Sequence, residues 1–175
     1  MRSILLYFLF IYSFSSHAQA ITAEELLERS IDFHDPIGKW ETAELELILR
    51  METPNQAQRV SKVNINNAAG TFSVEYVSKG HLLNYQVQAN DSVEVWVDFQ
   101  KATGRTDIDS LDLSAYRGRR WRNYYSYLYG LPMKLKDEGT IIEEKVERKT
   151  FKGKEYLVLK ATYSKEVGKD TWYFY

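Results

Sequence analysis

The side chains best suited to binding a ligand cluster in one segment that mixes basic and aromatic residues. Its members are Tyr116, Arg117, Arg119, Arg120, Trp121, Arg122, Tyr124 and Tyr125. Guanidinium groups pair bidentately with carboxylates and phosphates and pack on aromatic rings, so the segment could hold an anionic headgroup or an oligosaccharide phosphate. A second interpretation is structural, because Tyr and Trp bury a large apolar body and keep a polar tip at the rim of a core. A helix that loosely covers a concave sheet would satisfy both and leave an apolar groove.

Patterns typical of catalysis are missing. After residue 20 the only histidines are His34 and His81, and neither has a second ligand two to four residues away, which argues against a zinc site. Glu143 and Glu144 would face opposite sides of a strand and could not act together as acid and base. The chain has no G-x-S-x-G elbow, no Gly-rich phosphate loop and no cysteine. We therefore expect no enzyme activity, no cofactor and no metal.

Composition limits the possible partners. The chain has 175 residues with 23 Lys plus Arg and 24 Asp plus Glu, so its formal net charge is −1 and nucleic acid is not an expected partner. The hydrophobic fraction of 44% and the aromatic fraction of 14% are typical of a folded domain and too high for a disordered chain.

The first twenty residues predict export. A short basic start precedes an apolar run over residues 4–14, and Ala18-Gln19-Ala20 has the A-x-A pattern of a signal peptidase site. The apolar run is too short to span a bilayer. We expect a signal peptide over residues 1–20, a single domain over 21–175, no membrane span after cleavage, and location in the periplasm of a Gram-negative bacterium. The lack of cysteine excludes a lipid-modified N-terminal Cys.

Hydrophobic periodicity predicts a mainly antiparallel β protein. Thr22 and Glu25 form a capping box that opens a helix, and Asp35-Pro36 ends it. From residue 43 apolar and polar residues alternate, which predicts strands at 45–49, 60–66, 72–78, 82–89 and 93–99. The spacers are too short for parallel crossovers, so neighbouring strands form a meander. One face of this sheet is apolar, with Phe99 and Ala89 among its members, and needs a cover.

Helical spacing returns over residues 110–129, which predicts the cover. Its apolar positions are Leu113, Tyr116, Trp121, Tyr124, Tyr125 and Leu128, and Gly130-Leu131-Pro132 ends it. Strands at 140–147 and 155–163 follow, and a last strand begins near Thr171. Because the chain ends on this β-prone run, we expect a C-terminally truncated chain, the alternative being a centrally paired strand that ends at Tyr175.

Several segments carry a family resemblance. They are residues 121–135, 150–157 and 165–174, together with His34-Asp35-Pro36 and Trp40. These segments resemble a family of exported proteins of unknown function found mainly in Bacteroidota, whose general shape is similar to the LolA/LolB lipoprotein-carrier fold. The resemblance covers most of the chain after residue 20, although residues 70–119 match only in pattern. It implies an incomplete antiparallel barrel with helices on its concave side, and family members that continue beyond residue 175. It transfers no catalytic residue.

The sequence thus predicts an α+β, mainly β protein: an antiparallel open or half barrel with an N-terminal helix and an aromatic helix covering the concave face. We expect a periplasmic or envelope binding protein for a lipophilic ligand, such as an acyl chain, a lipoprotein or a similar amphiphile. The expected groove residues are Tyr124, Tyr125, Leu128 and Met133, with Arg120 or Arg122 at its mouth. The alternatives are a non-catalytic envelope module with a protein partner docked on an edge strand, and a hydrolase that uses His34 or His81.

Overall fold

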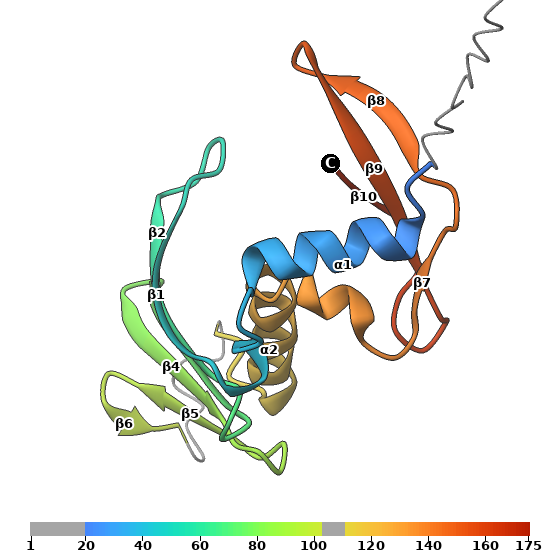
Figure 1. Ribbon diagram of the computed structural model, residues 1–175. Helices are drawn as coiled ribbons and strands as arrows, with labels where there is room; N and C mark the ends of the chain where they lie inside the picture. The colour runs from blue at the N-terminus through green and yellow to red at the C-terminus, as the bar shows by residue number, and fades with distance from the viewer. Residues whose placement is uncertain (1–19, 103–110) are drawn as a thin grey trace, which may run out of the picture.

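Two antiparallel sheets and two long helices make up the fold in the computed structural model, which describes residues 20–102 and 111–175 (Figure 1). All of the expected signal peptide except Ala20 lies outside the described residues. The predicted fold class is confirmed: the protein is mainly antiparallel β with added helices, and in the described part of the chain neither sheet closes into a barrel.

The larger sheet is the predicted meander. Six strands follow one another in sequence order, every neighbour antiparallel: β1 (Glu44–Met51), β2 (Arg59–Asn66), β3 (Thr71–Ser78), β4 (His81–Val87), β5 (Val93–Val97) and β6 (Gln100–Lys101). The sequence did not predict β6. Asp98 and Phe99 adopt positive φ angles of 49° and 66° and form the two-residue turn that returns the chain into it.

Helix α2 (Ala115–Tyr129) covers the apolar face of this sheet and packs against β3, β4 and β5 (Figure 1). Ser114 caps the helix by accepting a hydrogen bond from the backbone N–H of Arg117. The buried core between the helix and the sheet holds Val63, Ile65, Phe72, Val74, Tyr76, Leu83, Tyr85, Val87, Val95, Val97, Leu111 and Tyr125. Gly118 permits the close approach, because a Cβ there would lie 2.6 Å from Val93 Cγ1.

Some predicted core positions are wrong. Phe99 is 81% exposed because it lies in the turn after β5, and Ala89 is exposed because β4 ends two residues before it. On helix α2, Tyr116 and Tyr124 are exposed. The helix presents a narrow face to the sheet, so residues on either side of that face remain accessible to solvent.

The C-terminal strands form a second, smaller sheet on the other side of helix α1 (Figure 1). Its members are β7 (Thr140–Ile142), β8 (Glu147–Phe151), β9 (Lys154–Tyr163) and β10 (Trp172–Phe174). The prediction of one strand over 140–147 is wrong. β7 and β8 pair with different halves of β9, and residues 143–146 oppose only Leu159 and Lys160, so the ladder is interrupted there.

Helix α1 (Ala23–His34) packs against β9 and begins as predicted, since Thr22 accepts a hydrogen bond from the backbone N–H of Glu25. Asp35 ends the helix and accepts hydrogen bonds from the backbone N–H groups of Lys39 and Trp40, at 2.7 and 2.9 Å. The 3₁₀ turns η1 (Trp40–Thr42) and η2 (Met133–Lys136) lead into β1 and out of α2. A second core of Ala23, Leu27, Leu135, Leu159 and Ala161 joins this helix to the small sheet.

Candidate ligand-binding site

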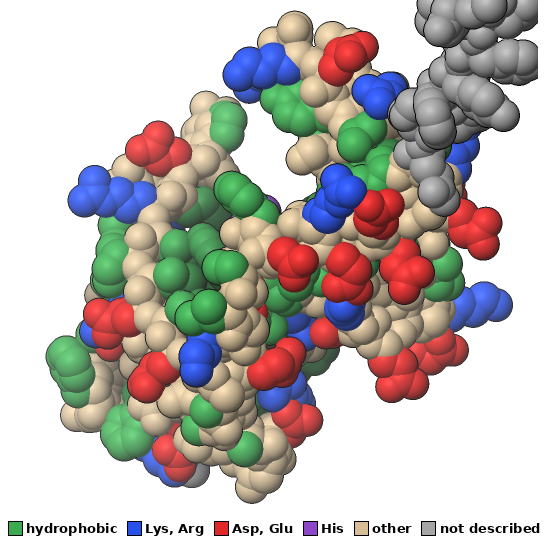
Figure 2. Space-filling model, viewed as in Figure 1, with side chains coloured by type: hydrophobic (Ala, Val, Ile, Leu, Met, Phe, Trp, Pro, Cys, Tyr) green, Lys and Arg blue, Asp and Glu red, His purple; other side chains and the backbone are tan. Residues whose placement is uncertain are grey.

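The inner face of β1 lies beside the part of the large sheet that helix α2 covers. Leu45, Leu47 and Leu49 point to the helix side and remain half-buried, and Met51 continues the row at 37% exposure. Helix α2 packs over β3 to β5, so the edge strand β1 lies beyond its main contact. Figure 2 shows an open notch between the β1–β2 hairpin and the β8–β9 hairpin, with hydrophobic side chains gathered along β1 and β2.

A row of stacked aromatic rings follows one side of helix α2. Trp121, Tyr125 and Tyr129 are spaced four residues apart, which places them on one helix face. The ring centres of Trp121 and Tyr125 are 5.3 Å apart, and those of Tyr125 and Tyr129 are 6.3 Å apart. Tyr125 also stacks on Phe72 in the core, so the row is held against the sheet. We call these three residues the aromatic row.

Two arginines meet at the Trp121 end of the aromatic row. The guanidinium carbon of Arg59 lies 4.8 Å from the Trp121 ring centre and 5.4 Å from that of Tyr76. The guanidinium carbon of Arg117 lies 5.0 Å from the Trp121 ring centre. Arg59 Nη2 donates a hydrogen bond to the Tyr125 hydroxyl at 3.3 Å. Both cations are therefore held by ring faces rather than by carboxylates.

A hollow of about 280 Å³ opens at this place, and we call it the arginine hollow. It is lined by Met51, Arg59, Arg117, Arg120, Trp121 and Tyr124. Met51 and Arg59 are partners in the register of β1 and β2, and the other four residues come from the first three turns of α2. The hollow thus combines an apolar strand end, two aromatic rings and three cations.

The structure brings only some of the predicted site residues to the arginine hollow. Arg120 and Tyr124 line it, and Tyr125 lies beneath it with its hydroxyl on Arg59. Arg122 turns to another side of the helix, where it donates to the carboxylate of Asp91 at 2.5 Å. Leu128 and Met133 are half-buried and line none of its surface.

The sequence prediction missed Arg59 and Met51. A signal for Arg59 existed, because alternation along β2 puts it on the same face as the buried residues Ser61, Val63 and Ile65. A basic residue on an otherwise buried strand face is costly unless it has a partner, so it is a candidate for a binding site. Arg117 belonged to the basic cluster noted in the sequence, but spacing alone could not show that it meets a residue of another element.

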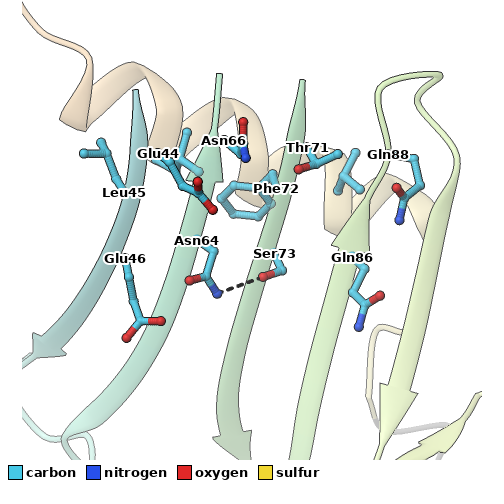
Figure 3. Close-up of a pocket in the computed structure, with 12 residues that line it drawn as sticks. Glu44, Leu45, Glu46, Asn64, Asn66, Thr71, Phe72, Ser73, Gln86 and Gln88 are labelled. Carbon is cyan, nitrogen blue, oxygen red and sulfur yellow. Dashed lines mark hydrogen bonds between the residues drawn. The ribbon is translucent and has the colours of Figure 1, made fainter. Parts of the chain in front are cut away.

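The outer face of the same sheet carries a different hollow, of about 450 Å³ (Figure 3). Glu46, Asn64, Ser73 and Gln86 point to this side, away from helix α2, from four adjacent strands. The amide of Asn64 donates to the Ser73 hydroxyl at 3.1 Å, and Glu46 pairs with Lys62 at 2.9 Å. Because Asn64, Ser73 and Glu46 already have partners on this side of the sheet, we interpret this surface as an ordinary polar face.

Two further hollows lie near the C-terminal sheet. One of about 630 Å³ has a mixed polar and apolar lining that includes Arg122, Lys134 and Asp137. Another, of about 290 Å³, lies between α1, η2 and the small sheet and is mainly apolar, with His34 at its edge. His34 Nδ1 is already hydrogen-bonded to the carbonyl of Ser30 at 2.8 Å. In neither lining does a cation lie over a ring of the same lining, as Arg59 and Arg117 lie over Trp121 in the arginine hollow.

Comparison with known protein families shows to which family the chain belongs. The model of DUF6503, a family of unknown function, matches residues 2–175. The chain belongs to this family. No curated protein and no solved structure matches it. The expected membership in a family of unknown function is thereby confirmed, whereas the likeness of shape to lipoprotein carriers stays an expectation.

The DUF6503 assignment names no activity. Over residues 20–102 and 111–175, no three His, Asp or Glu side chains gather so that they could hold a metal ion. In the same ranges no helix is both long and apolar enough to cross a membrane. His81 pairs with Asp98 at 2.7 Å on the surface, and neither His81 nor His34 lines the arginine hollow.

Proposed function

We propose that this DUF6503 protein is a binding protein for a lipophilic ligand, with the aliphatic part of the ligand lying along the inner face of β1. The observation that carries the proposal is the inward row of β1, in which Leu45, Leu47 and Leu49 are half-buried and Met51 is exposed, and which ends at the arginine hollow. Such a row costs free energy in water, at about 25 cal/mol for each Å² of exposed apolar surface. A ligand that covers it recovers this energy.

Two features support the proposal. The aromatic row gives the site a rigid wall, because each ring stacks on the next and Tyr125 stacks on the core residue Phe72. The opposite wall, β1, is an edge strand. An edge strand can shift without breaking a ladder on its outer side, which suits a site that admits chains of different thickness.

Location in the periplasm or envelope, after removal of residues 1–20, is part of the same proposal. It rests on the basic start, the apolar run and the Ala18-Gln19-Ala20 site in the sequence. An acyl chain, a lipoprotein or a similar amphiphile is the expected ligand class.

The test uses two neighbouring residues on one strand. Leu49 faces α2, and Ile48 faces outward at 60% exposure. We expect Leu49→Gln to weaken the uptake of a fluorescent fatty acid about tenfold, because an amide would sit against the alkyl chain. Ile48→Gln should leave uptake unchanged. Circular dichroism and the urea midpoint confirm that both variants fold. Equal uptake by the two variants, or no uptake by the unchanged chain, contradicts the proposal.

A second candidate function is an interaction module of the envelope. It is favoured by exposed aromatic side chains at the edge strand β10 and beside it, namely Phe151, Trp172, Tyr173 and Tyr175. An edge strand can accept a strand from a partner. A protein that carries no lipid, and whose binding to an envelope protein is lost in Tyr173→Lys, would favour this function over lipid binding.

A further inference from the structure

We infer that the arginine hollow recognises a negatively charged headgroup, so that the ligand is an anionic amphiphile and not a neutral lipid. The inference rests on the proposed function, because it assigns the headgroup of the same bound molecule. The chemistry required of the headgroup is that of a carboxylate or a phosphate monoester, since both pair with guanidinium groups.

Hydrogen-bond donors around the hollow lack acceptors. The Nε atoms of Arg59 and Arg117 and the Nε1 atom of Trp121 are buried, and none has an acceptor among the described residues. Arg59 uses Nη2 on the Tyr125 hydroxyl and on Met51 Sδ, at 3.3 and 3.4 Å, and neither acceptor is charged. Buried polar groups almost always find partners in folded proteins, so three such donors on residues that line one hollow mark it as an unusual site, and a bound acceptor would relieve this deficit.

The described part of the chain offers the cations at the hollow no ion-pair partner. No carboxylate in residues 20–102 or 111–175 forms an ion pair with Arg59, Arg117 or Arg120. Asp112 is near enough to interact electrostatically with Arg117 and Arg120. Its carboxylate, however, accepts the hydroxyl and backbone N–H of Ser114. Three cations therefore share one hollow, and two of them, Arg59 and Arg117, are partly buried.

The position of Arg117 at the start of helix α2 adds to the excess of positive charge at the hollow. The first turn of the helix contains no acidic residue, and Arg117 lies in it. The N-terminus of a helix is its positive end, where basic side chains are unfavourable and anions are favourable. A bound anion would offset both the helix dipole and the mutual repulsion of the guanidinium groups. Departures from local rules of this kind are expected at functional sites.

The hollow has the size of a headgroup site and continues into the apolar face. Its volume of about 280 Å³ lies below the range of sites that enclose a whole lipid-sized molecule. Met51 lines it and is the last residue of the inward row of β1. A headgroup at Arg59 and Arg117 therefore places an attached chain beside Leu49 and Leu47.

The test compares ligands that share a dodecyl chain and differ in the headgroup. Dodecanoate, dodecyl phosphate and dodecanol are titrated at pH 8 against the protein loaded with the neutral probe Nile red. The two anions are kept below their micellar concentrations and dodecanol below its solubility limit. We expect at least one anion to bind about tenfold more tightly than dodecanol, because hydrogen bonds to charged groups exceed neutral ones by that order. If both anions bind more tightly than dodecanol, a carboxylate is a sufficient headgroup for the hollow. If only dodecyl phosphate does so, the hollow recognises a phosphate headgroup.

Protein variants test whether Arg59 and Arg117 cause the preference for anionic ligands. In Arg59→Met/Arg117→Met the advantage of the anion over dodecanol should fall below about twofold, while dodecanol binds as before. Arg119→Met is the matched control, because Arg119 lies on the same helix but donates to the carbonyl of Asp91, at 3.4 Å, and does not line the hollow. It should keep the full preference for the anion.

The outcomes separate this inference from the function on which it rests. If dodecanol binds the unchanged protein as tightly as both anions, the lipophilic site stands and the anionic headgroup is wrong. If the double variant keeps the preference, the headgroup site lies elsewhere and the assignment to Arg59 and Arg117 is wrong. If neither Nile red nor any of the three ligands binds, the proposed function fails and this inference fails with it.

Discussion

The guanidinium group of Arg59, at the start of β2, lies over the ring of Trp121 in helix α2, 4.8 Å from its centre. Arg117 approaches the same ring to 5.0 Å, so one indole holds two like charges. In a partly desolvated setting each such contact contributes about 1–2 kcal/mol, which opposes the repulsion between the cations. Trp121 is thus the residue that makes a cationic site possible at this end of the sheet.

Replacing Trp121 should test that role directly. We expect Trp121→Leu to destabilise the protein by about 2–4 kcal/mol, because it removes apolar contacts and both cation–π interactions together. Trp121→Phe keeps a smaller ring and should cost less. Urea unfolding at low and at 0.5 M salt gives the comparison, and salt should restore part of the lost stability of Trp121→Leu by screening Arg59 from Arg117. A loss that does not depend on salt would contradict the account of repulsion.

Gly118 sets the distance between helix α2 and the sheet. A Cβ at this position would lie 2.6 Å from Val93 Cγ1 and 3.4 Å from Tyr85 Cδ1. We expect Gly118→Ala to lower the free energy of unfolding by about 1–3 kcal/mol through overpacking, although alanine is the better helix former. Val93→Ala removes the obstructing methyl groups, so the double variant should recover part of the loss. Additive effects of the two changes, measured by urea unfolding, would rule out this contact as the cause.

Asp91 should make the protein sensitive to acid. Its hydrogen bond from Arg122 holds the pKa of its carboxyl below the usual value, and the charge of Arg122 adds to this effect. A carboxyl whose pKa is depressed by folding stabilises the protein above its unfolded pKa of about 3.9, and this contribution is lost as the pH falls through the lower, folded value.

Asp91→Asn is the suitable variant, because residue 91 has a φ of 63° and asparagine tolerates this conformation as well as aspartate does. We expect the variant to be less stable than the unchanged protein at pH 7 and to approach it as the pH falls from 5 to 2. Urea unfolding at several pH values measures the difference between the two. A difference that stays constant over this range would show that the pair does not titrate with folding.

The fold was more predictable than the site, and the reason is physical. Alternation along one strand reveals which face is buried, so β1 to β5 and the side covered by α2 follow from local pattern. The departures occur where local pattern conflicts with tertiary pairing. Phe99 continues the alternation of β5 but is placed in a turn by a positive φ, and residues 143–146 leave the ladder because β7 and β8 use different parts of β9.

The site depends on which elements meet, and that information is absent from local pattern. Arg59 precedes Trp121 by more than sixty positions, and their contact requires the register of β2 and the tilt of α2 together. Arg120 and Arg122 are two residues apart on the helix and point to different surfaces, one to the arginine hollow and one to Asp91. Sequence could therefore indicate the helix that carries the site but not the side of the helix that forms it.

The hydroxyl groups of Tyr127 and Tyr163 join helix α2 to the second sheet through a hydrogen bond. Burial, followed by this hydrogen bond, raises the pKa of Tyr127 above its usual value of about 10. Folding then favours the neutral phenol, so its contribution to stability is complete below pH 10 and is lost as the pH rises toward the folded pKa.

We expect Tyr127→Phe to lower stability at pH 7 by about 1–3 kcal/mol, because the Tyr163 hydroxyl loses its partner. The double variant Tyr127→Phe/Tyr163→Phe should cost less than the sum of the single changes, since it leaves no hydroxyl unpaired. Guanidinium unfolding at pH 7 measures the cost of each substitution, and unfolding at pH 10.5 measures the stability that is lost at alkaline pH. If Tyr127→Phe loses as much stability between pH 7 and pH 10.5 as the unchanged protein does, ionisation of Tyr127 is not the cause of that loss.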